Sequence, residues 1–390
     1  MRWSAVLLLA ATVSSALAQG PEVTAKAAIL IDADTGTVLF EKNAHTRRQP
    51  ASTTKMMTGL LALEKIPAGT MITAPGDIEK IGESSLHLRP GEQLTREDAL
   101  YALLLRSAND MAHTLAVHIA GSDAAFARMM NERAKAIGCK NTSFKNPHGL
   151  PNDQHQTTAY DLALIAKEAM KNEWFKRIVS TQKWFVMRSN NQKDLLVEST
   201  NKLLWEDAFV EGVKTGYTRA AGRCFVGSRN EGNLRLISVV LGSEDWAEDT
   251  RTLFNWGYNQ VELRARYSKG DIVGKVPIDG ASVENANVQV SGDFAMFSPA
   301  SAPPAEIIFT EQTAPVAAGT LAGKLRFVGT TGEIAEYPLV FAEDIPAKPL
   351  ILTLAGNWRT WAAMGVMGLC FAAFRGRRRP QRRVSRLHAR

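Results

Sequence analysis

Two apolar segments, one near each end of the chain, limit which residues can form a globular fold. The first runs from Ala5 to Val13, follows the positive charge of Arg2 and precedes several small residues. This order is typical of a cleaved secretory signal, and the apolar core is too short to span a bilayer comfortably. We therefore expect a signal peptide at residues 1–18 and an exported mature chain that starts near Gln19.

The second apolar segment, residues 360–374, has no polar face and is followed by eight arginines and no acidic residue in 375–390. A helix without a polar face inserts into a bilayer rather than lying on it, and arginines directly beyond it stay in the cytoplasm. We expect a membrane anchor at residues 360–374 and a basic cytoplasmic tail at 375–390. About twenty residues normally cross the hydrocarbon core, so full spanning stays open.

The positive charge of the chain is concentrated in this tail. The formal net charge is +7, and the tail alone carries eight positive charges, which leaves the rest of the chain close to neutral. A nucleic-acid-binding domain needs basic residues clustered on a folded face. The charge pattern therefore excludes nucleic acid as a partner.

Residues 19–263 mix strand and helix patterns. Thr95 lies three residues before Asp98 and ahead of an apolar run, which predicts a capped helix start. Hairpins are predicted where two β-rich runs are joined by short polar loops, and helices where apolar residues recur at helical spacing. These patterns cover Ala27 to Phe40 and Phe225 to Leu241 for hairpins, and Met111 to Ala120, Asp123 to Ile137, Tyr160 to Met170 and Glu244 to Trp256, the last ending at Gly257, for helices. They predict an α+β domain with an antiparallel sheet flanked by helices.

Residues 264–345 have a different composition. Val, Gly, Pro and Thr occur in short runs such as Asp271 to Val276, Val288 to Val290, Glu306 to Phe309 and Gly323 to Val328. Short β-rich runs separated by turn residues predict a small C-terminal all-β domain. Residues 346–359 would then link this domain to the anchor.

Three short motifs follow one another along the first domain: Ser52-Thr53-Thr54-Lys55, Ser107-Ala108-Asn109 and Lys214-Thr215-Gly216. Each motif alone is weak evidence, because such short strings occur by chance in most proteins of this size. Their joint occurrence in this order and at these separations is a specific signal.

The residue types in these motifs suit acyl transfer. Residues three apart on a helix share a face, so the amine of Lys55 should lie beside the hydroxyl of Ser52. A serine hydroxyl needs a base that takes its proton, and a lysine can do so only if its pKa is lowered, for example by burial near the cation Lys214. Ser107 could relay a proton to the leaving amine. Asn109 could bind the substrate amide or hold Lys55.

An acyl-transfer site also needs donors for the developing oxyanion. We expect the backbone N–H of Ser52, at a helix N-terminus, and that of Tyr217 to supply them. Gly216 matters because a side chain there would block a substrate that lies along the strand edge.

The three motifs resemble those of penicillin-binding proteins and class A β-lactamases. The chain is most similar to the low-molecular-mass D-alanyl-D-alanine carboxypeptidases, over about residues 26–257. The resemblance extends to Asn146–Leu150, to Thr158–Asp161 and to Glu211–Thr218.

This resemblance implies a role for each motif residue. Ser52 is the acylated nucleophile and Lys55 the general base. Ser107 and Asn109 are the catalytic residues of the second motif. Substrate binding falls to four consecutive residues, of which the first two hold the terminal carboxylate: Lys214, Thr215, Gly216 and Tyr217.

The resemblance also implies the biology. The enzyme would remove the terminal D-alanine from peptidoglycan stem peptides during cell-wall remodelling, with a role in cell shape. β-Lactam antibiotics would act as covalent inhibitors. The site would need no metal and no cofactor, and the protein would lie on the periplasmic face of the bacterial inner membrane, held by its C-terminus.

Several alternatives stay open. A β-lactamase of class A uses a glutamate to deacylate, and between Phe144 and Tyr160 this chain offers only Asp153. A DD-endopeptidase could use the same motifs, and an inactive cell-wall-binding protein could retain them.

The remaining histidines and cysteines predict no further chemistry. His113 and His118 are five residues apart, off a common helix face, which favours a structural role over metal binding. His148 has no visible acid partner, so we expect it to shape a loop. The three cysteines predict no disulfide framework, and whether Cys139 and Cys224 pair stays open.

Overall fold

The computed structural model describes residues 20–190, 195–259, 264–297, 305–328 and 334–349. The expected signal peptide (1–18), anchor (360–374) and tail (375–390) lie outside these residues. No helix within the described residues is both long and apolar enough to cross a membrane. The chain divides into two compact units: Tyr267–Gly292, Glu306–Arg326 and the residues from Glu336 onward form the second, and the rest forms the first.

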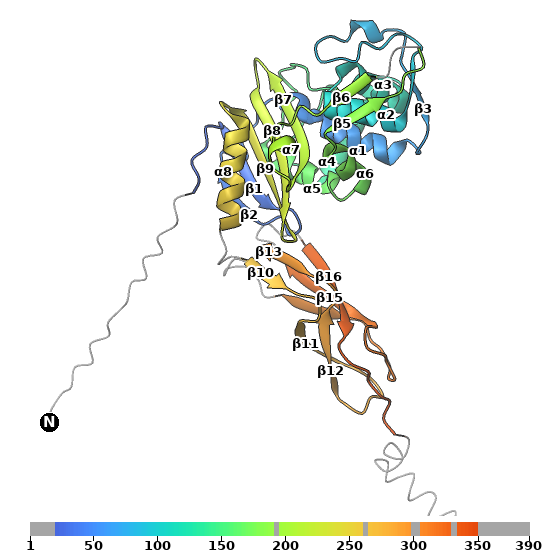
Figure 1. The fold of residues 1–390 in the computed structure, drawn as a ribbon, viewed down its shortest axis with the longest axis vertical. Helices are drawn as coiled ribbons and strands as arrows, with labels where there is room; N and C mark the ends of the chain where they lie inside the picture. Colours follow the sequence, from blue (N-terminus) through green and yellow to red (C-terminus); the bar gives the residue numbers. More distant parts are fainter. Residues whose placement is uncertain (1–19, 191–194, 260–263, 298–304, 329–333, 350–390) are drawn as a thin grey trace, which may run out of the picture. The chain divides into compact units, whose positions relative to one another are not determined.

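A five-stranded antiparallel sheet forms the centre of the first unit (Figure 1). Its strands, in the order β2-β1-β9-β8-β7, are Val38–Lys42, Ala27–Asp32, Leu234–Ser243, Gly222–Glu231 and Val210–Thr218. The pairs β1–β2 and β8–β9 are the two predicted hairpins. β7 is an edge strand.

Both faces of this sheet are covered, so all six residues of β1 are buried. Successive side chains of a strand point to opposite faces. Ile29 and Ile31 accordingly pack with the main helical block, whereas Ala28 and Leu30 pack with α8 (Trp246–Asn259). Figure 1 shows α8 on one side of the sheet and the helical block on the other. The predicted α+β architecture is confirmed.

Three helices of the helical block begin at a residue whose side chain caps the first turn. The side chains of Thr95, Ser122 and Thr158 each accept a hydrogen bond from a backbone N–H three residues on, at 3.1, 3.2 and 3.0 Å. Such caps satisfy donors that have no partner inside the helix. Its helices are α1 (Lys55–Lys65), α2 (Arg96–Tyr101), α3 (Asn109–Ala120), α4 (Asp123–Ile137), α5 (Ala159–Ala169) and α6 (Glu173–Val179).

Short elements complete the first unit. α7 (Leu203–Glu206) packs on the α8 side of the sheet. Three single-turn or irregular helices, η1 (Ala51–Thr54), η2 (Ile78–Lys80) and η3 (Ala102–Arg106), lie in the helical block. Two-stranded sheets pair β3 (Met71–Thr73) with β4 (Gln93–Thr95), β5 (Lys183–Val186) with β6 (Leu195–Glu198), and β10 (Arg264–Tyr267) with β13 (Phe294–Phe297).

The predicted end of α8 at Gly257 is wrong, because the helix continues to Asn259. A β-carbon at Gly257 would lie 2.7 Å from Leu30 Cδ2 and 2.8 Å from Leu236 Cδ1. The glycine therefore lets the helix approach the sheet closely, and it does not end the helix.

A further five-stranded sheet, in the order β11-β12-β16-β15-β14, lies mostly in the second unit. β11 pairs antiparallel with β12, β12 with β16, and β14 with β15. The expected C-terminal all-β region is confirmed, although β16 was not foreseen. The strands are Ile272–Pro277, Asn285–Val290, Ile334–Phe341, Leu321–Val328 and Glu306–Phe309, in the order of the sheet.

Candidate active site

The first motif lies where a tight turn leads into α1. Within η1, the hydroxyls of Thr53 and Thr54 donate to the carbonyl oxygens of Pro50 and Ala51, both at 2.8 Å. This turn leaves Ser52 half-buried, one turn before the first residues of α1.

The amine of Lys55 is fully buried and lies at the centre of three oxygen atoms. Its Nζ is 3.0 Å from Ser52 Oγ, 2.7 Å from Asn109 Oδ1 and 2.8 Å from the backbone oxygen of His148. A neutral amine has two N–H donors and one lone pair. In a neutral Lys55 whose two N–H groups donate to Asn109 and His148, the lone pair would face the hydroxyl of Ser52.

Electrostatics favour this neutral form. Burial is the main cause that lowers the pKa of Lys55 well below its usual value, and the positive charge of Lys214 adds to it. Asp110 and Glu83 oppose the shift but do not reverse it. Desolvation disfavours an ammonium, so Lys55 is suited to accept a proton.

The second motif occupies a break between two helices. η3 ends at Arg106 and is followed by Ser107, whose φ of 64° and ψ of 34° are left-handed; α3 starts two residues later at Asn109. Asn109 is fixed by its Nδ2, which donates to the oxygen of Gly82 at 3.0 Å, and by its backbone N–H, which donates to Ser84 O at 2.7 Å. Its side-chain oxygen is thereby held toward Lys55, one of the two arrangements that the sequence left open. The hydroxyl of Ser107 has no hydrogen-bond partner among the described residues.

The third motif brings β7 against the turn that carries Ser52. A β-carbon at Gly216 would lie 3.0 Å from Ser52 N and 3.2 Å from Ala51 Cβ. The glycine is therefore needed for close approach to the η1 backbone, a reason that differs from the expected obstruction of a substrate. Tyr217 follows it on the strand with its side chain exposed.

Lys214 and Thr215 precede this contact on β7. Lys214 is buried, its Nζ donates to the backbone oxygen of Thr215 at 3.0 Å, and burial lowers the pKa of its amine to about 7. The Thr215 hydroxyl lies 2.6 Å from that of Thr200. Of the three motifs, the structure brings Ser52, Lys55 and Asn109 into direct contact and places β7 alongside them.

His148 has an acid neighbour that the sequence did not reveal. Its Nε2 lies 4.0 Å from Asp123 Oδ2, at the start of α4. Burial is the main cause that lowers the pKa of His148 to about 3, so the imidazole is neutral and the contact is not an ion pair. The hydrogen bond from Lys55 to the backbone oxygen of His148 could not be predicted from the sequence, because every residue has a backbone carbonyl.

His113 lies between two carboxylates, and Cys139 and Cys224 form no disulfide with each other. His113 is buried, with Nδ1 2.8 Å from Asp123 and Nε2 3.3 Å from Asp77, and the hydrogen bond to Asp123 is the main cause that raises its pKa. Across the described ranges, no cluster of three potential metal ligands occurs. Cys139 and Cys224 are both free thiols.

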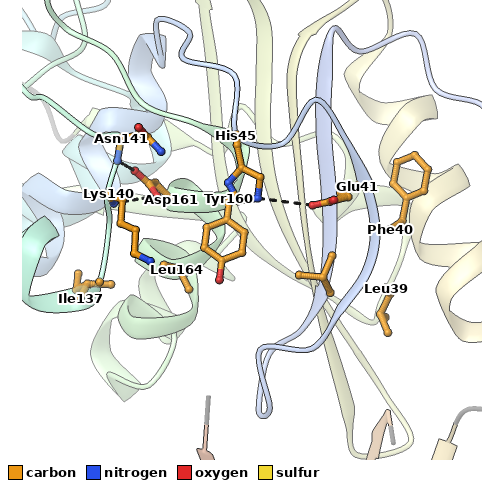
Figure 2. A pocket seen from close by; sticks show the side chains of 12 residues that line it. Leu39, Phe40, Glu41, His45, Ile137, Lys140, Asn141, Tyr160, Asp161 and Leu164 are labelled. Atoms are coloured by element: carbon orange, nitrogen blue, oxygen red, sulfur yellow. Dashed lines mark hydrogen bonds and ion pairs between the residues drawn. The ribbon is translucent and has the colours of Figure 1, made fainter. Parts of the chain in front are cut away.

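Two pockets of the first unit differ in their relation to the motifs. One, of about 790 Å³, lies between β2 and α5 (Figure 2), where the rings of His45 and Tyr160 lie with their centroids 4.7 Å apart and their planes tilted by 35°. None of its lining residues belongs to the three motifs. The other, of about 940 Å³, is lined by Arg106 and Asp110, the chain neighbours of Ser107 and Asn109.

Known proteins resemble this chain in sequence and in fold. Residues 13–245 match the family model described as D-alanyl-D-alanine carboxypeptidase. The chain is 32% identical to the D-alanyl-D-alanine carboxypeptidase DacF of Bacillus subtilis, over 86% of this chain and 90% of the relative, and 31% identical to DacA of Escherichia coli, over 84% and 85%. Among solved structures it resembles penicillin binding protein 5 from Haemophilus influenzae, with a TM-score of 0.61, 26% identity, and coverage of 84% of this chain and 99% of that one.

Proposed function

The chain belongs to the D-alanyl-D-alanine carboxypeptidase family, and we propose that it releases the terminal D-alanine of peptidoglycan stem peptides through an acyl-enzyme on Ser52. As a serine-type carboxypeptidase it acts on the cell wall. One observation carries the assignment of the nucleophile. The amine of Lys55, whose pKa is lowered by burial, lies 3.0 Å from Ser52 Oγ.

Acylation begins with proton transfer from Ser52 to neutral Lys55. The serine oxygen then attacks the carbonyl between the last two D-alanines and forms a tetrahedral intermediate. The backbone N–H groups of Ser52 and Tyr217 stabilise its oxyanion, and the close approach at Gly216 supports this pairing of donors. Asn109 and the His148 carbonyl keep the amine of Lys55 in place.

The leaving D-alanine carries the terminal carboxylate and needs a proton on its nitrogen. Lys214 and Thr215 bind this carboxylate, and a bound anion favours the protonated form of Lys214. Ser107 relays the proton from Lys55 to the amine as the acyl bond breaks. Water then hydrolyses the acyl-enzyme and regenerates Ser52.

The location of the enzyme is proposed from its sequence. A signal peptide at 1–18 directs export, and a segment at 360–374 with a cytoplasmic tail at 375–390 holds the protein on the periplasmic face of the inner membrane. Between them lie a catalytic domain at 19–263, a β-rich domain at 264–345 and a linker at 346–359.

Release of D-alanine from a synthetic stem pentapeptide tests the proposal. We expect the purified protein to release one D-alanine per peptide, Ser52→Ala to lose this activity by a factor of at least about 10³, and Ser282→Ala, an exposed serine of the second unit, to retain it. Activity in Ser52→Ala equal to that of the control would overturn the assignment. A cross-linked dimer of stem peptides as substrate tests the DD-endopeptidase alternative, because an endopeptidase would cleave the cross-link.

A further inference from the structure

A buried carboxylate lies beside the second motif, where the 82–88 loop between η2 and β4 meets the start of α3. Asp110 directly follows Asn109, and only 1% of its surface is exposed. A buried charge is costly unless other groups bind it. Among the described residues Asp110 forms no ion pair, so hydrogen-bond donors have to bind its charge. Most of these donors belong to the 82–88 loop.

Three donors of the loop bind the carboxylate of Asp110. Its Oδ2 accepts hydrogen bonds from the Ser85 hydroxyl at 2.6 Å and from the backbone N–H groups of Leu86 and Leu88 at 3.0 and 3.1 Å. The N–H of Leu86 also lies 3.1 Å from Oδ1. The Ser85 hydroxyl in turn accepts a hydrogen bond from the backbone N–H of His87 at 2.9 Å. Hydrogen bonds to an ionised group are stronger than those between neutral groups, so Asp110 clamps the loop onto α3.

The same loop holds Asn109 through its carbonyl groups. The side-chain Nδ2 of Asn109 donates to Gly82 O at 3.0 Å, and its backbone N–H donates to Ser84 O at 2.7 Å. The Oδ1 of Asn109 lies 2.7 Å from Lys55 Nζ. A displacement of the loop would therefore move the acceptor that holds the amine of Lys55.

The backbone of the loop needs support from its surroundings. Glu83 and His87 have φ angles of 63° and 57°, in the left-handed region that side chains other than glycine rarely adopt. Such conformations persist only where neighbouring groups hold them. Arg188 supports the loop from the β5 side, where it donates to Leu86 O at 3.2 Å and to His87 O at 3.4 Å. On the α3 side the support is Asp110.

We propose that Asp110 is a positioning residue of the acyl-transfer site: it fixes the 82–88 loop, which fixes Asn109 and, through Asn109, the amine of Lys55. The inference rests on the proposed function and adds a residue that acts through others. A misplacement of about 1 Å in an active site can cost about a hundredfold in rate. Loss of the clamp should therefore lower kcat/KM as well as stability.

Asp110→Asn tests the clamp with little change in side-chain size. The N–H of Leu86 lies within hydrogen-bond distance of both carboxylate oxygens. In either orientation the new amide NH₂ group would therefore face this N–H group, and the charge is lost as well. We expect kcat/KM for release of D-alanine from a stem pentapeptide to fall by at least about tenfold.

Asp249 provides a matched control on α8. It also lies in the first turn of its helix and is buried, with 4% of its surface exposed. It accepts hydrogen bonds from the Ser243 hydroxyl at 2.6 Å and from the backbone N–H groups of Thr24 and Ala25 at 2.7 and 2.9 Å. None of these partners belongs to the three motifs. Asp249→Asn should lower the urea midpoint of unfolding, as Asp110→Asn does, but keep the kcat/KM of the wild type.

Ser85→Ala and Ser243→Ala repeat the comparison with a smaller change, which keeps the test valid if Asp110→Asn does not fold. Each removes one hydroxyl that lies 2.6 Å from its aspartate. Ser85→Ala should lower kcat/KM by about three- to tenfold, the effect of one hydrogen bond. Ser243→Ala should leave it unchanged.

A double-mutant cycle with Asn109→Ala tests whether Asp110 acts through Asn109. Where two residues act in one network, their effects on kcat/KM are not additive. Asp110→Asn should therefore cost much less in the Asn109→Ala background than in the wild type, because the side chain that the loop positions is already absent. The rate of acylation by benzylpenicillin provides the measurement where peptide turnover is slow.

The acid limb of the pH profile of kcat/KM is a readout that a purely structural role would not move. In the proposed mechanism this limb reports the protonation of Lys55 in the free enzyme. The charges that act on Lys55 are those of Lys214, Asp110 and Glu83, and the charge of Asp110 raises its pKa. Removal of this charge lowers the pKa of Lys55, so Asp110→Asn should move the limb to lower pH. Asp249→Asn should leave the limb in place.

The outcomes separate this role from the proposed function. Equal kcat/KM in Asp110→Asn and Asp249→Asn, additive effects in the cycle, or an acid limb that stays in place would overturn the positioning role, while release of D-alanine by the wild type upholds the function. A wild type that neither releases D-alanine nor is acylated by benzylpenicillin would overturn both.

Discussion

The candidate site contains two buried lysines, Lys55 and Lys214, that form no ion pair with any acid among the residues that the structure describes. The amines of Lys55 and Lys214 are both buried, and burial lowers the pKa of each. A carboxylate in contact with Lys55 would raise its pKa and keep it charged, so it could not accept a proton near neutral pH. Spacing alone predicted that Lys55 meets Ser52, because residues three apart share a helix face. The His148 carbonyl was not predictable, since every residue carries one.

The pH dependence of kcat/KM tests the charge on Lys214. Its pKa of about 7 in the free enzyme means that it is protonated below this pH and loses its charge above it. In the proposed mechanism this charge binds the substrate carboxylate, so kcat/KM should fall as pH rises above about 7. In Lys214→Arg, whose guanidinium stays charged, this fall should disappear even if the absolute rate drops. If kcat/KM of Lys214→Arg still fell above about pH 7, the fall would have to come from the titration of another group.

At the scale of elements, the sequence predicted the parts that depend on local rules. The hairpin of β1 and β2 follows from alternation around an Asp- and Gly-rich turn, and the starts of α2 and α5 follow from threonine caps. The left-handed Ser107 and the contact of β7 with η1 were not predictable, because both are set by distant segments packing together. Gly257 was misread for the same reason: its close neighbours, Leu30 and Leu236, lie on other elements.

Gly257→Ala tests the packing of α8 on the sheet. The added methyl would meet Leu30 and Leu236 at less than 3 Å, so despite the better helix propensity of alanine we expect the free energy of unfolding to fall by about 1–3 kcal/mol. Asn255→Ala, at an exposed position of the same helix, should change it by no more than about 0.5 kcal/mol. Urea denaturation of both variants measures the difference. A Gly257→Ala protein as stable as the wild type would contradict the close approach.

At the scale of the molecule, composition distinguished two units. The change to short β-rich runs after Arg264 predicted a β-sheet region, and the structure contains a five-stranded sheet there. β16 was missed because Pro338 interrupts its pattern in the sequence. The terminal segments were assigned from hydropathy and charge alone, so their roles remain predictions that fractionation can test.

We expect the full chain to stay in the membrane pellet after extraction with alkaline carbonate. A variant that lacks residues 360–390 should appear in the soluble fraction and release D-alanine at the rate of the full chain. Carbonate extraction that frees the full chain would contradict an inserted anchor.

The central claim is that the hydroxyl oxygen of Ser52, which is activated by Lys55 and lies beside β7, is the nucleophile that forms the acyl-enzyme. Peptide mapping by mass spectrometry after incubation with benzylpenicillin tests it most directly. We predict one penicilloyl group per chain, slowly lost, on the peptide that carries Ser52, and none in Ser52→Ala. A stable adduct on any other residue, or an adduct that persists in Ser52→Ala, would contradict the account.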